Sequence, residues 1–254
     1  MRCHLIATAL MILVSAPLQA ADMPANITAA VAAPERSDKD RERDVRDHPA
    51  EFMTFAGIAS GMKIADVFGG GGYWTELMAR AVGPGGHVQL VNNSPYFAYA
   101  AFSTKDLKPR FEGNRLPNAD QITVETCDLK LGTSAYDVIM IFMSYHDLYY
   151  VDEGDGWPAI DASHFLDQLH AALKPGGHLL IVDHAAAAGT GSSSAQNLHR
   201  IDEAFARQDI ASHGFELEKT WDGYRNPGDD LTKLVFDPAV RGKTDRFTHL
   251  YRKR

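Results

Sequence analysis

The chain has 254 residues, of which 45% are hydrophobic and 23% charged, and its formal net charge at pH 7 is −8. Such an acidic chain is a poor general binder of nucleic acid, because that binding needs clustered positive charge. The length suits one domain with a sizeable core, and no apolar run after residue 20 is long enough to span a bilayer. We therefore expect one domain that binds neither nucleic acid nor membrane.

The first twenty residues have the pattern of a secretory signal. Arg2 precedes a largely apolar stretch, 5–18, and small residues lead up to Ala20. We expect cleavage after Ala20 and export to a bacterial periplasm, and the alternative is an uncleaved segment that anchors the protein in the membrane. Cleavage would remove Cys3 and leave only Cys127, so that no disulfide could form within the mature chain.

The next segment, 21–39, is predicted to be a flexible leader, and the folded domain is expected to cover 40–254. Residues 34–52 are dense in charges of both signs, which favours a solvated helix. The alternative is a helix across the mouth of a ligand site, where Arg43, Asp44 or Arg46 would touch a bound molecule.

Strand and helix signals alternate along the rest of the chain. Strands are predicted at 62–68, 87–91, 122–124, 136–143, 179–182, 215–220 and 247–251. Apolar residues at helical spacing predict helices at 73–82, from about 95, around 165–173 and across 198–214. Asp161 is predicted to cap the third of these helices. Apolar strands separated by helices require a parallel sheet covered on both faces, so the predicted fold is a single doubly wound α/β domain.

Four consecutive glycines, Gly69 to Gly72, follow the first strand. Ligands of such sheets bind beyond the carboxyl ends of the strands, where glycine permits close approach and the next helix offers free N–H groups. A dinucleotide fingerprint would require glycine in place of Trp74 and an acid in place of Asn92. A nucleotide-dependent oxidoreductase is therefore less favoured than a protein that binds another small cofactor.

Four stretches together resemble the class I S-adenosylmethionine-dependent methyltransferases. They are the glycine run "IADVFGGGGYW" with its helix, "TCDLKL", "YDVIMIFMSYHDL" and "LHAALKPGGHLLIVD". The later "NPGDD" and "FDPAVRGKTDRF" are similar to a bacterial subgroup of exported predicted methyltransferases. The resemblance implies a Rossmann-like, seven-stranded, mostly parallel sheet whose last strand is antiparallel. It also implies S-adenosylmethionine as the cofactor.

The same resemblance implies roles around the glycine run. Asp66 would orient this loop and the amino-acid end of the cofactor. Gly69, Gly70 and Gly71 would admit the cofactor to the backbone, and Tyr73 would begin the helix beneath it.

Two further positions of the resemblance concern the adenosine end. Asp128 would contact the adenine. Asn92 stands where the family usually has an acid that binds both ribose hydroxyls, and an amide offers one acceptor oxygen without charge. We therefore expect weakened cofactor binding, which Asn92→Asp would strengthen; the alternative is that Asn92 only forms a turn.

The segment 144–150, "SYHDLYY", follows the fourth strand near the expected position of the reactive methyl group. His146 is the candidate general base, with Asp147 or Tyr145 orienting it or shaping the pocket. The alternative is a buried structural histidine. Other polar residues nearby could gather around a divalent cation: Asp183, His184, His199 and Asp202. No ligand-spacing motif supports such a site, and we assign no metal.

The favoured function is an S-adenosylmethionine-dependent methyltransferase that acts on a small molecule or a protein. The main alternative is a non-catalytic ligand-binding protein that retains the fold, because the cofactor is made in the cytoplasm whereas the chain is predicted to be exported.

Overall fold

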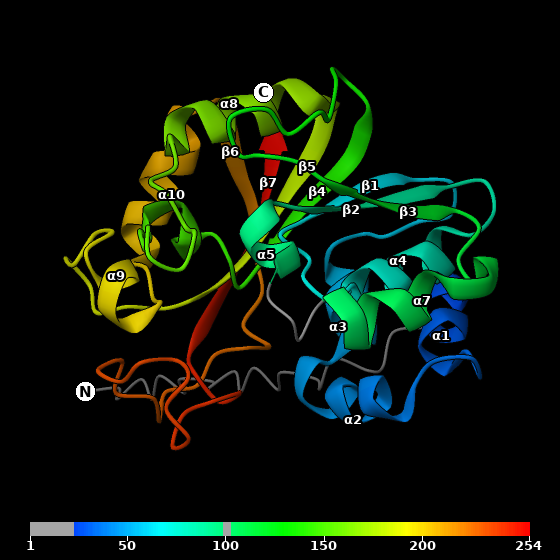
Figure 1. Cartoon of the computed structure of the whole chain (residues 1–254), viewed down its shortest axis with the longest axis horizontal. Coiled ribbons are helices and arrows are strands. Elements are labelled where there is room, and N and C mark those ends of the chain that lie inside the picture. The colour runs from blue at the N-terminus through cyan, green and yellow to red at the C-terminus, as the bar shows by residue number, and fades with distance from the viewer. Residues whose placement is uncertain (1–22, 99–102) are drawn as a thin grey trace, which may run out of the picture.

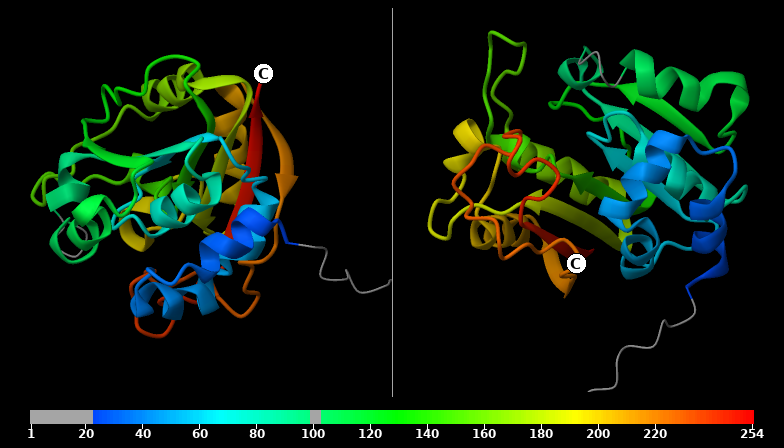
Figure 2. Two further views of the ribbon diagram at one scale, coloured as in Figure 1. Left: turned by 90° about the vertical axis from the view of Figure 1, so that its right-hand side faces the viewer. Right: turned by 90° about the horizontal axis from the view of Figure 1, so that it is seen from below.

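The computed structural model describes residues 23–98 and 103–254, so the predicted signal segment and its cleavage site lie outside the described residues. One twisted sheet runs through the molecule, with helices on both of its faces (Figures 1 and 2). No helix in the described ranges has both the length and the apolar character that a membrane crossing needs.

The sheet has seven strands in the order β3-β2-β1-β4-β5-β7-β6. Their bounds are β1 (Lys63–Val67), β2 (His87–Asn92), β3 (Ala119–Thr123), β4 (Tyr136–Phe142), β5 (Leu173–His184), β6 (Phe215–Thr220) and β7 (Arg246–Lys253). Strands β1 to β5 run parallel, and β7 is antiparallel to its neighbours β5 and β6. The structure thus confirms the predicted seven-stranded, doubly wound fold with an antiparallel last strand.

The helices divide the core into two layers. They are α1 (Ala25–Ala32), α2 (Asp38–Asp47), α3 (Pro49–Phe55), α4 (Tyr73–Val82), α5 (Ser94–Ala98), α7 (Lys108–Phe111), α8 (Ala162–Ala172), α9 (Ser194–Leu198) and α10 (Glu203–Ser212). Phe165 of α8 and Ile210 of α10 belong to one buried cluster, whereas Ile27 of α1, Phe52 of α3 and Leu77 of α4 belong to the other. Both faces of the sheet are therefore covered, as its apolar strands require.

The prediction of a flexible leader at 21–39 is wrong for the part that the structure describes. Helix α1 packs on α4, and its Ile27 and Ala30 are 0% and 1% exposed. Asn26 Nδ2 also donates to the backbone oxygen of Ala81 at 3.0 Å. The folded domain therefore begins well before residue 40. The small Ala30 and the apolar Ile27 form the face of α1 that packs on the core.

Two predicted helices are each divided in the structure. The charged segment 34–52 becomes α2 and α3, separated at His48, which has a φ of 42°. The predicted helix across 198–214 becomes α9 and α10, and His199 between them has a φ of 51°. Apolar spacing does not reveal these breaks. The first is the single left-handed residue His48, whereas the second spans 199–202, so that only Leu198 of the predicted range belongs to α9. The predicted cap is confirmed, since Asp161 accepts from the backbone N–H of His164 at 3.0 Å.

Candidate active site

The glycine loop turns the chain from β1 into α4 at the carboxyl edge of the sheet. Gly70 and Gly72 have positive φ angles of 56° and 74°, a conformation that side chains other than glycine rarely adopt. A Cβ atom on Gly69 would lie 2.5 Å from Cγ of Asp66. The turn itself therefore requires several of these glycines, in addition to any requirement set by a ligand.

Asn92, at the end of β2, closes this loop with two hydrogen bonds. Its Nδ2 donates to the backbone oxygen of Gly70, and the backbone N–H of Gly70 donates to its Oδ1, both at 3.0 Å. Both polar atoms of the buried amide are thus used by the loop. A carboxylate would lose the donor and face a carbonyl oxygen. These contacts argue against a gain in affinity from Asn92→Asp, and its effect on cofactor binding stays a prediction.

Asp66 lies buried beneath the loop, and one of its two carboxylate oxygens accepts no hydrogen bond from the described residues. Thr75 donates to its Oδ2 at 2.6 Å, whereas its Oδ1 has no hydrogen-bond partner among the described residues. Burial raises the pKa of Asp66 to about 6, although the hydrogen bond from Thr75 opposes the shift. This orientation fits the predicted role of Asp66 below the glycine loop.

Helix α2 lies beside the start of α4. Tyr73 donates its hydroxyl hydrogen to Asp44 at 2.7 Å, and the guanidinium carbon of Arg43 lies 4.0 Å from the centre of the Tyr73 ring. The charged segment 34–52 is therefore not simply solvated. Its position favours the alternative interpretation of a helix that borders the ligand site.

Three arginines surround one buried carboxylate between α2 and β7, and we call these four residues the arginine cluster. Asp47 is 0% exposed and accepts from Arg43 at 2.6 Å and from Arg46 at 2.9 Å, while Arg246 lies 3.8 Å away. Burial lowers the pKa of Arg246, and its Nε has no partner in the described part of the chain. The cluster thus has surplus positive charge and an unused donor.

The second group of buried charges, which we call the imidazole cluster, consists of His146, Asp147, Asp183 and His199. Asp183 accepts from the Nδ1 and from the backbone N–H of His146, both at 2.7 Å. On the other side of the ring, His146 Nε2 lies 3.2 Å from Asp147 Oδ1 and 3.3 Å from His199 Nδ1. The structure therefore brings together two predicted catalytic residues and two of the residues considered for a cation.

The protonation of His146 bears on its predicted role as a general base. Burial would lower the pKa of this imidazole, but the carboxylates of Asp183 and Asp147 outweigh burial and raise the pKa to about 10. At neutral pH and without another cation, the ring is therefore an imidazolium, with a proton on each nitrogen and a positive charge. It can orient an acceptor in that state, but it can take up a proton only after losing its own.

Tyr145, the third predicted catalytic residue, is separated from this cluster. It is 0% exposed, and its hydroxyl donates to Asp209 of α10, which also accepts from Tyr149 at 2.6 Å. Its side chain therefore belongs to the core on the α10 side. The prediction that Tyr145 orients His146 is wrong, because successive residues after β4 point in different directions.

Two aromatic side chains, Tyr96 and Trp157, cover the imidazole cluster. The Tyr96 hydroxyl donates to Asp147 Oδ2 at 2.8 Å, and the Tyr96 ring stacks on Phe68 with centroids 5.1 Å apart. Trp157 donates from Nε1 to the backbone oxygen of Asp147 at 3.1 Å. No motif marks Tyr96, since its role depends on a contact between residues 51 positions apart.

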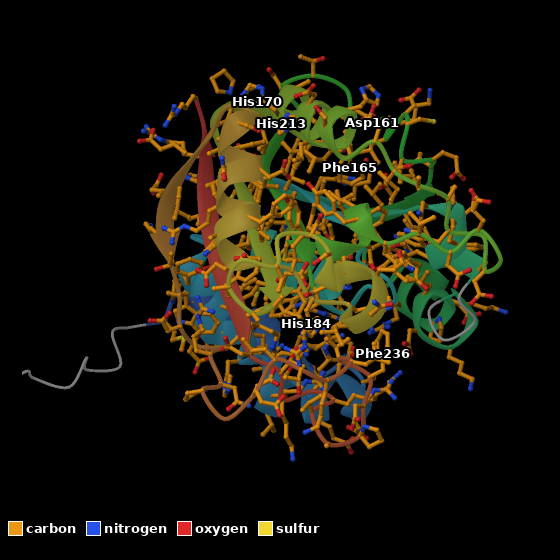
Figure 3. All side chains as sticks on the ribbon, turned by 90° about the vertical axis from the view of Figure 1, so that its left-hand side faces the viewer. Asp161, Phe165, His170, His184, His213 and Phe236 are labelled. Atoms are coloured by element: carbon orange, nitrogen blue, oxygen red, sulfur yellow. The ribbon has the colours of Figure 1, made fainter. Side chains whose placement is uncertain are left out.

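Three further predicted residues belong to neither cluster, although the ring of His184 lies 5.9 Å from that of His146. Asp128 is exposed and forms an ion pair with Lys130, and its contact with adenine stays a prediction. His184, which Figure 3 shows in the lower half of the view, away from His170 and His213 at the top, shares a 2.7 Å hydrogen bond between its Nδ1 and Thr244. Asp202 caps α10 by accepting from the backbone of Ala204 at 2.8 Å.

A cavity of about 770 Å³ opens beside the end of β5. Its lining includes Asp202, Glu203, Arg207, Arg225 and Asp245. Neither the glycine loop nor the imidazole cluster contributes to that lining, so the cavity gives no argument for where an acceptor binds.

Comparison with known proteins identifies the fold and the family. Residues 37–220 match a family model described as a methyltransferase domain. The structure is similar to an S-adenosylmethionine-dependent methyltransferase from Aquifex aeolicus, with a TM-score of 0.56 and 17% identity over 86% of this chain and 100% of that one. It is also similar to an arsenic(III) S-adenosylmethionine methyltransferase from Chlamydomonas reinhardtii, with a TM-score of 0.54 and 18% identity over 90% and 73% of the two chains. No curated protein matches the chain.

These findings support S-adenosylmethionine as the cofactor, and the side chains at the edge of the sheet fit it. The amino-acid end of this cofactor bears an ammonium and a carboxylate group. Asp66 Oδ1 is a spare acceptor, and Arg246 Nε is a spare donor within the described residues. Buried polar atoms are seldom left unpaired, so we expect these two atoms to take part in binding the charged end.

Proposed function

Because the chain belongs to the methyltransferase domain family, we propose that it transfers the methyl group of S-adenosylmethionine to a small molecule or a protein. The observation that carries this proposal is the juxtaposition of two strand ends. The glycine loop follows β1 and His146 follows β4, and these strands are paired from Ile64 and Val138 onward. The cofactor and its acceptor would therefore meet at one edge of the sheet.

In the proposed reaction, a lone pair of the acceptor attacks the sulfonium methyl group. The carbon–sulfur bond breaks, S-adenosylhomocysteine leaves, and the acceptor loses a proton. His146 and Asp147 would hold the nucleophile in line with the methyl group, and such positioning supplies much of the acceleration of two-substrate reactions. Trp157 and Tyr96, which cover this region, would help to exclude water.

Two measurements on the purified protein test the proposal. Calorimetric titration with S-adenosylmethionine and S-adenosylhomocysteine should show binding of both. Transfer of a labelled methyl group to a fraction of cell extract should then identify the acceptor. His146→Ala should lower turnover by about 10²-fold or more with little change in cofactor affinity, because the nucleophile would no longer be held in line with the methyl group, whereas His213→Ala should leave turnover unchanged.

The results also distinguish the alternatives. Unchanged turnover in His146→Ala would remove this residue from the reaction. Cofactor binding without transfer to any fraction would favour the non-catalytic binding protein. Failure of both ligands to bind at millimolar concentration would leave methyltransferase only as a description of the fold.

We further propose that the protein is exported and belongs with the exported subgroup that its C-terminal motifs resemble. The support is the pattern of the first twenty residues, with its apolar stretch and small residues before Ala21. N-terminal sequencing of protein from the periplasm should begin at Ala21 or within a few residues of it. Membrane-bound protein that retains Met1 would instead indicate an uncleaved anchor.

A further inference from the structure

Three side chains of the imidazole cluster direct donor atoms towards a common point. The Nε2 atom of His146 lies 3.2 Å from Asp147 Oδ1 and 3.3 Å from His199 Nδ1, and the remaining edge, from His199 Nδ1 to Asp147 Oδ1, is 3.7 Å. A tetrahedral zinc ion bound at about 2.0–2.1 Å sets its ligand atoms roughly 3.3–3.4 Å apart. We propose that His146, Asp147 and His199 bind a divalent transition-metal ion.

The hydrogen bonds behind these donors have the arrangement that a metal site needs. Asp183 accepts from His146 Nδ1 at 2.7 Å, which turns the lone pair of Nε2 towards the other two donors. Tyr96 donates to Oδ2 of Asp147 at 2.8 Å and leaves Oδ1 for the ion. A carboxylate behind a ligating histidine fixes the tautomer of the ring and raises its basicity.

His199 is held in place by its backbone and by two aromatic rings. It ends α9 in the left-handed conformation, with a φ of 51°. The centroid of its ring lies 4.6 Å from that of Tyr150 and 5.0 Å from that of Phe236. The imidazole therefore keeps its direction although the residue lies outside regular secondary structure.

The competing occupant of this space is a proton. A proton on His146 Nε2 can be donated in a hydrogen bond to Asp147 Oδ1 or to His199 Nδ1. It cannot also bridge the pair formed by Asp147 Oδ1 and His199 Nδ1. A divalent ion accepts a lone pair from each of the three atoms at once. It also matches the two carboxylates, Asp147 and Asp183, which are both buried and would otherwise face each other across a single imidazole.

The donor set limits the choice of ion. Two imidazoles and one carboxylate suit Zn²⁺ or Fe²⁺, and three protein ligands leave at least one position open. The side chain of His199 is 17% exposed, whereas those of His146 and Asp147 are 4% and 12% exposed, so the surface side of the donor triangle is the His199 side. The residues come from the exit of β4 and from the end of α9, which explains the absence of a ligand-spacing motif in the sequence.

The catalytic role of the ion rests on the proposed methyl transfer, whereas its binding does not. An acceptor O–H, N–H or S–H group in the open position would lose its proton to solvent, because a bound cation stabilises the conjugate base. That anion would attack the sulfonium methyl group as the carbon–sulfur bond breaks. The ion would then release the methylated product with no change in its own charge.

The test measures metal binding by the full chain without an affinity tag. After treatment with a chelator and dialysis, calorimetric titration with Zn²⁺ should show one ion per chain, and Co²⁺ should produce the visible absorption of a tetrahedral site. His199→Asn, which tolerates the left-handed backbone, should weaken Zn²⁺ binding more than about 100-fold, and Asp183→Asn about 10–100-fold.

A matched histidine far from the site provides the control. His213 is paired with Asp167 at 2.7 Å. Figure 3 shows it near the top of the molecule, away from His184, whose ring lies 5.9 Å from that of His146, so His213→Ala should bind Zn²⁺ as the parent does. Equal binding by the parent and His199→Asn would indicate an adventitious ion only and would overturn the proposal, as would the absence of stoichiometric binding. Titration with S-adenosylmethionine in parallel separates this result from failure of the proposed function.

Discussion

The arginine cluster and the imidazole cluster lie beside the carboxyl ends of the strands, and their surplus charges have opposite signs. The first places three guanidinium groups around Asp47, and the second places two carboxylates around His146. Buried charges without matching partners are costly, because desolvation is not repaid by pairing. In the arginine cluster this applies to Asp47 and Arg246, whereas the side chains of Arg43 and Arg46 are 30% and 46% exposed. The contrast indicates that one region is prepared for an anionic group and the other for a cationic one.

The largest expected effect concerns the one carboxylate that holds the arginine cluster together. Asp47→Ala would leave Arg43, Arg46 and the buried Arg246 without their shared partner, so unfolding in urea should show a loss of about 3–5 kcal/mol. Asp38→Ala, an exposed position on the same helix, should change stability by less than about 0.5 kcal/mol. Equal effects of the two substitutions would mean that the cluster is not a unit.

A second prediction uses Asp66, whose pKa depends in part on Arg43 of the arginine cluster. The folded pKa of about 6 exceeds the ordinary value of 3.8, so the contribution of Asp66 to stability is full below the ordinary value and is lost as pH rises through 6. Relative to Asp66→Asn, the parent should therefore lose roughly 2–3 kcal/mol between about pH 4 and pH 7.

Urea unfolding at several pH values checks the Asp66 prediction. Asp38→Asn, the same substitution at an exposed position of α2, provides the matched control. The stability of the parent minus that of Asp66→Asn should fall as pH rises, and a value that stays constant or increases with pH would contradict the raised pKa.

The third prediction concerns the two hydrogen bonds between Asn92 and Gly70 of the glycine loop. Asn92→Asp should remove the hydrogen bond that Nδ2 donates to the backbone oxygen of Gly70. It would also place a negative charge against that oxygen, at a cost of about 1–3 kcal/mol in stability. Thermal unfolding and titration with S-adenosylmethionine should show a less stable protein with no gain in affinity. Tighter binding by the variant would show instead that the side chain turns towards the ribose when the cofactor binds.

The smallest expected effect is at a helix cap outside both clusters. Asp161→Ala should remove the hydrogen bond to the backbone of His164 and cost about 1 kcal/mol, the usual value for an N-cap. The affinities for S-adenosylmethionine and Zn²⁺ should stay as they are in the parent. A change in either affinity would mean that a general loss of stability is enough to alter ligand binding. Effects of substitutions within the two clusters could then not be assigned to their charges.

The sequence by itself determined the sheet, the glycine loop and the family. The central strand β4 is marked by a nearly unbroken apolar run and the loop by four consecutive glycines, so both signals lie within a few consecutive residues. The position of His146 after β4 was also predictable, because it follows from counting along the chain. The side chain that faces it was not.

Only the tertiary structure decided which side chains meet. His146, Asp183 and His199 are brought together because parallel strands end at one edge of the sheet and α9 stops at a left-handed residue. Asn92 binds Gly70 across 22 positions of sequence, and Tyr145 turns to α10 although it adjoins His146. Spacing along the chain carries no information about such contacts, because their geometry is set by packing between elements.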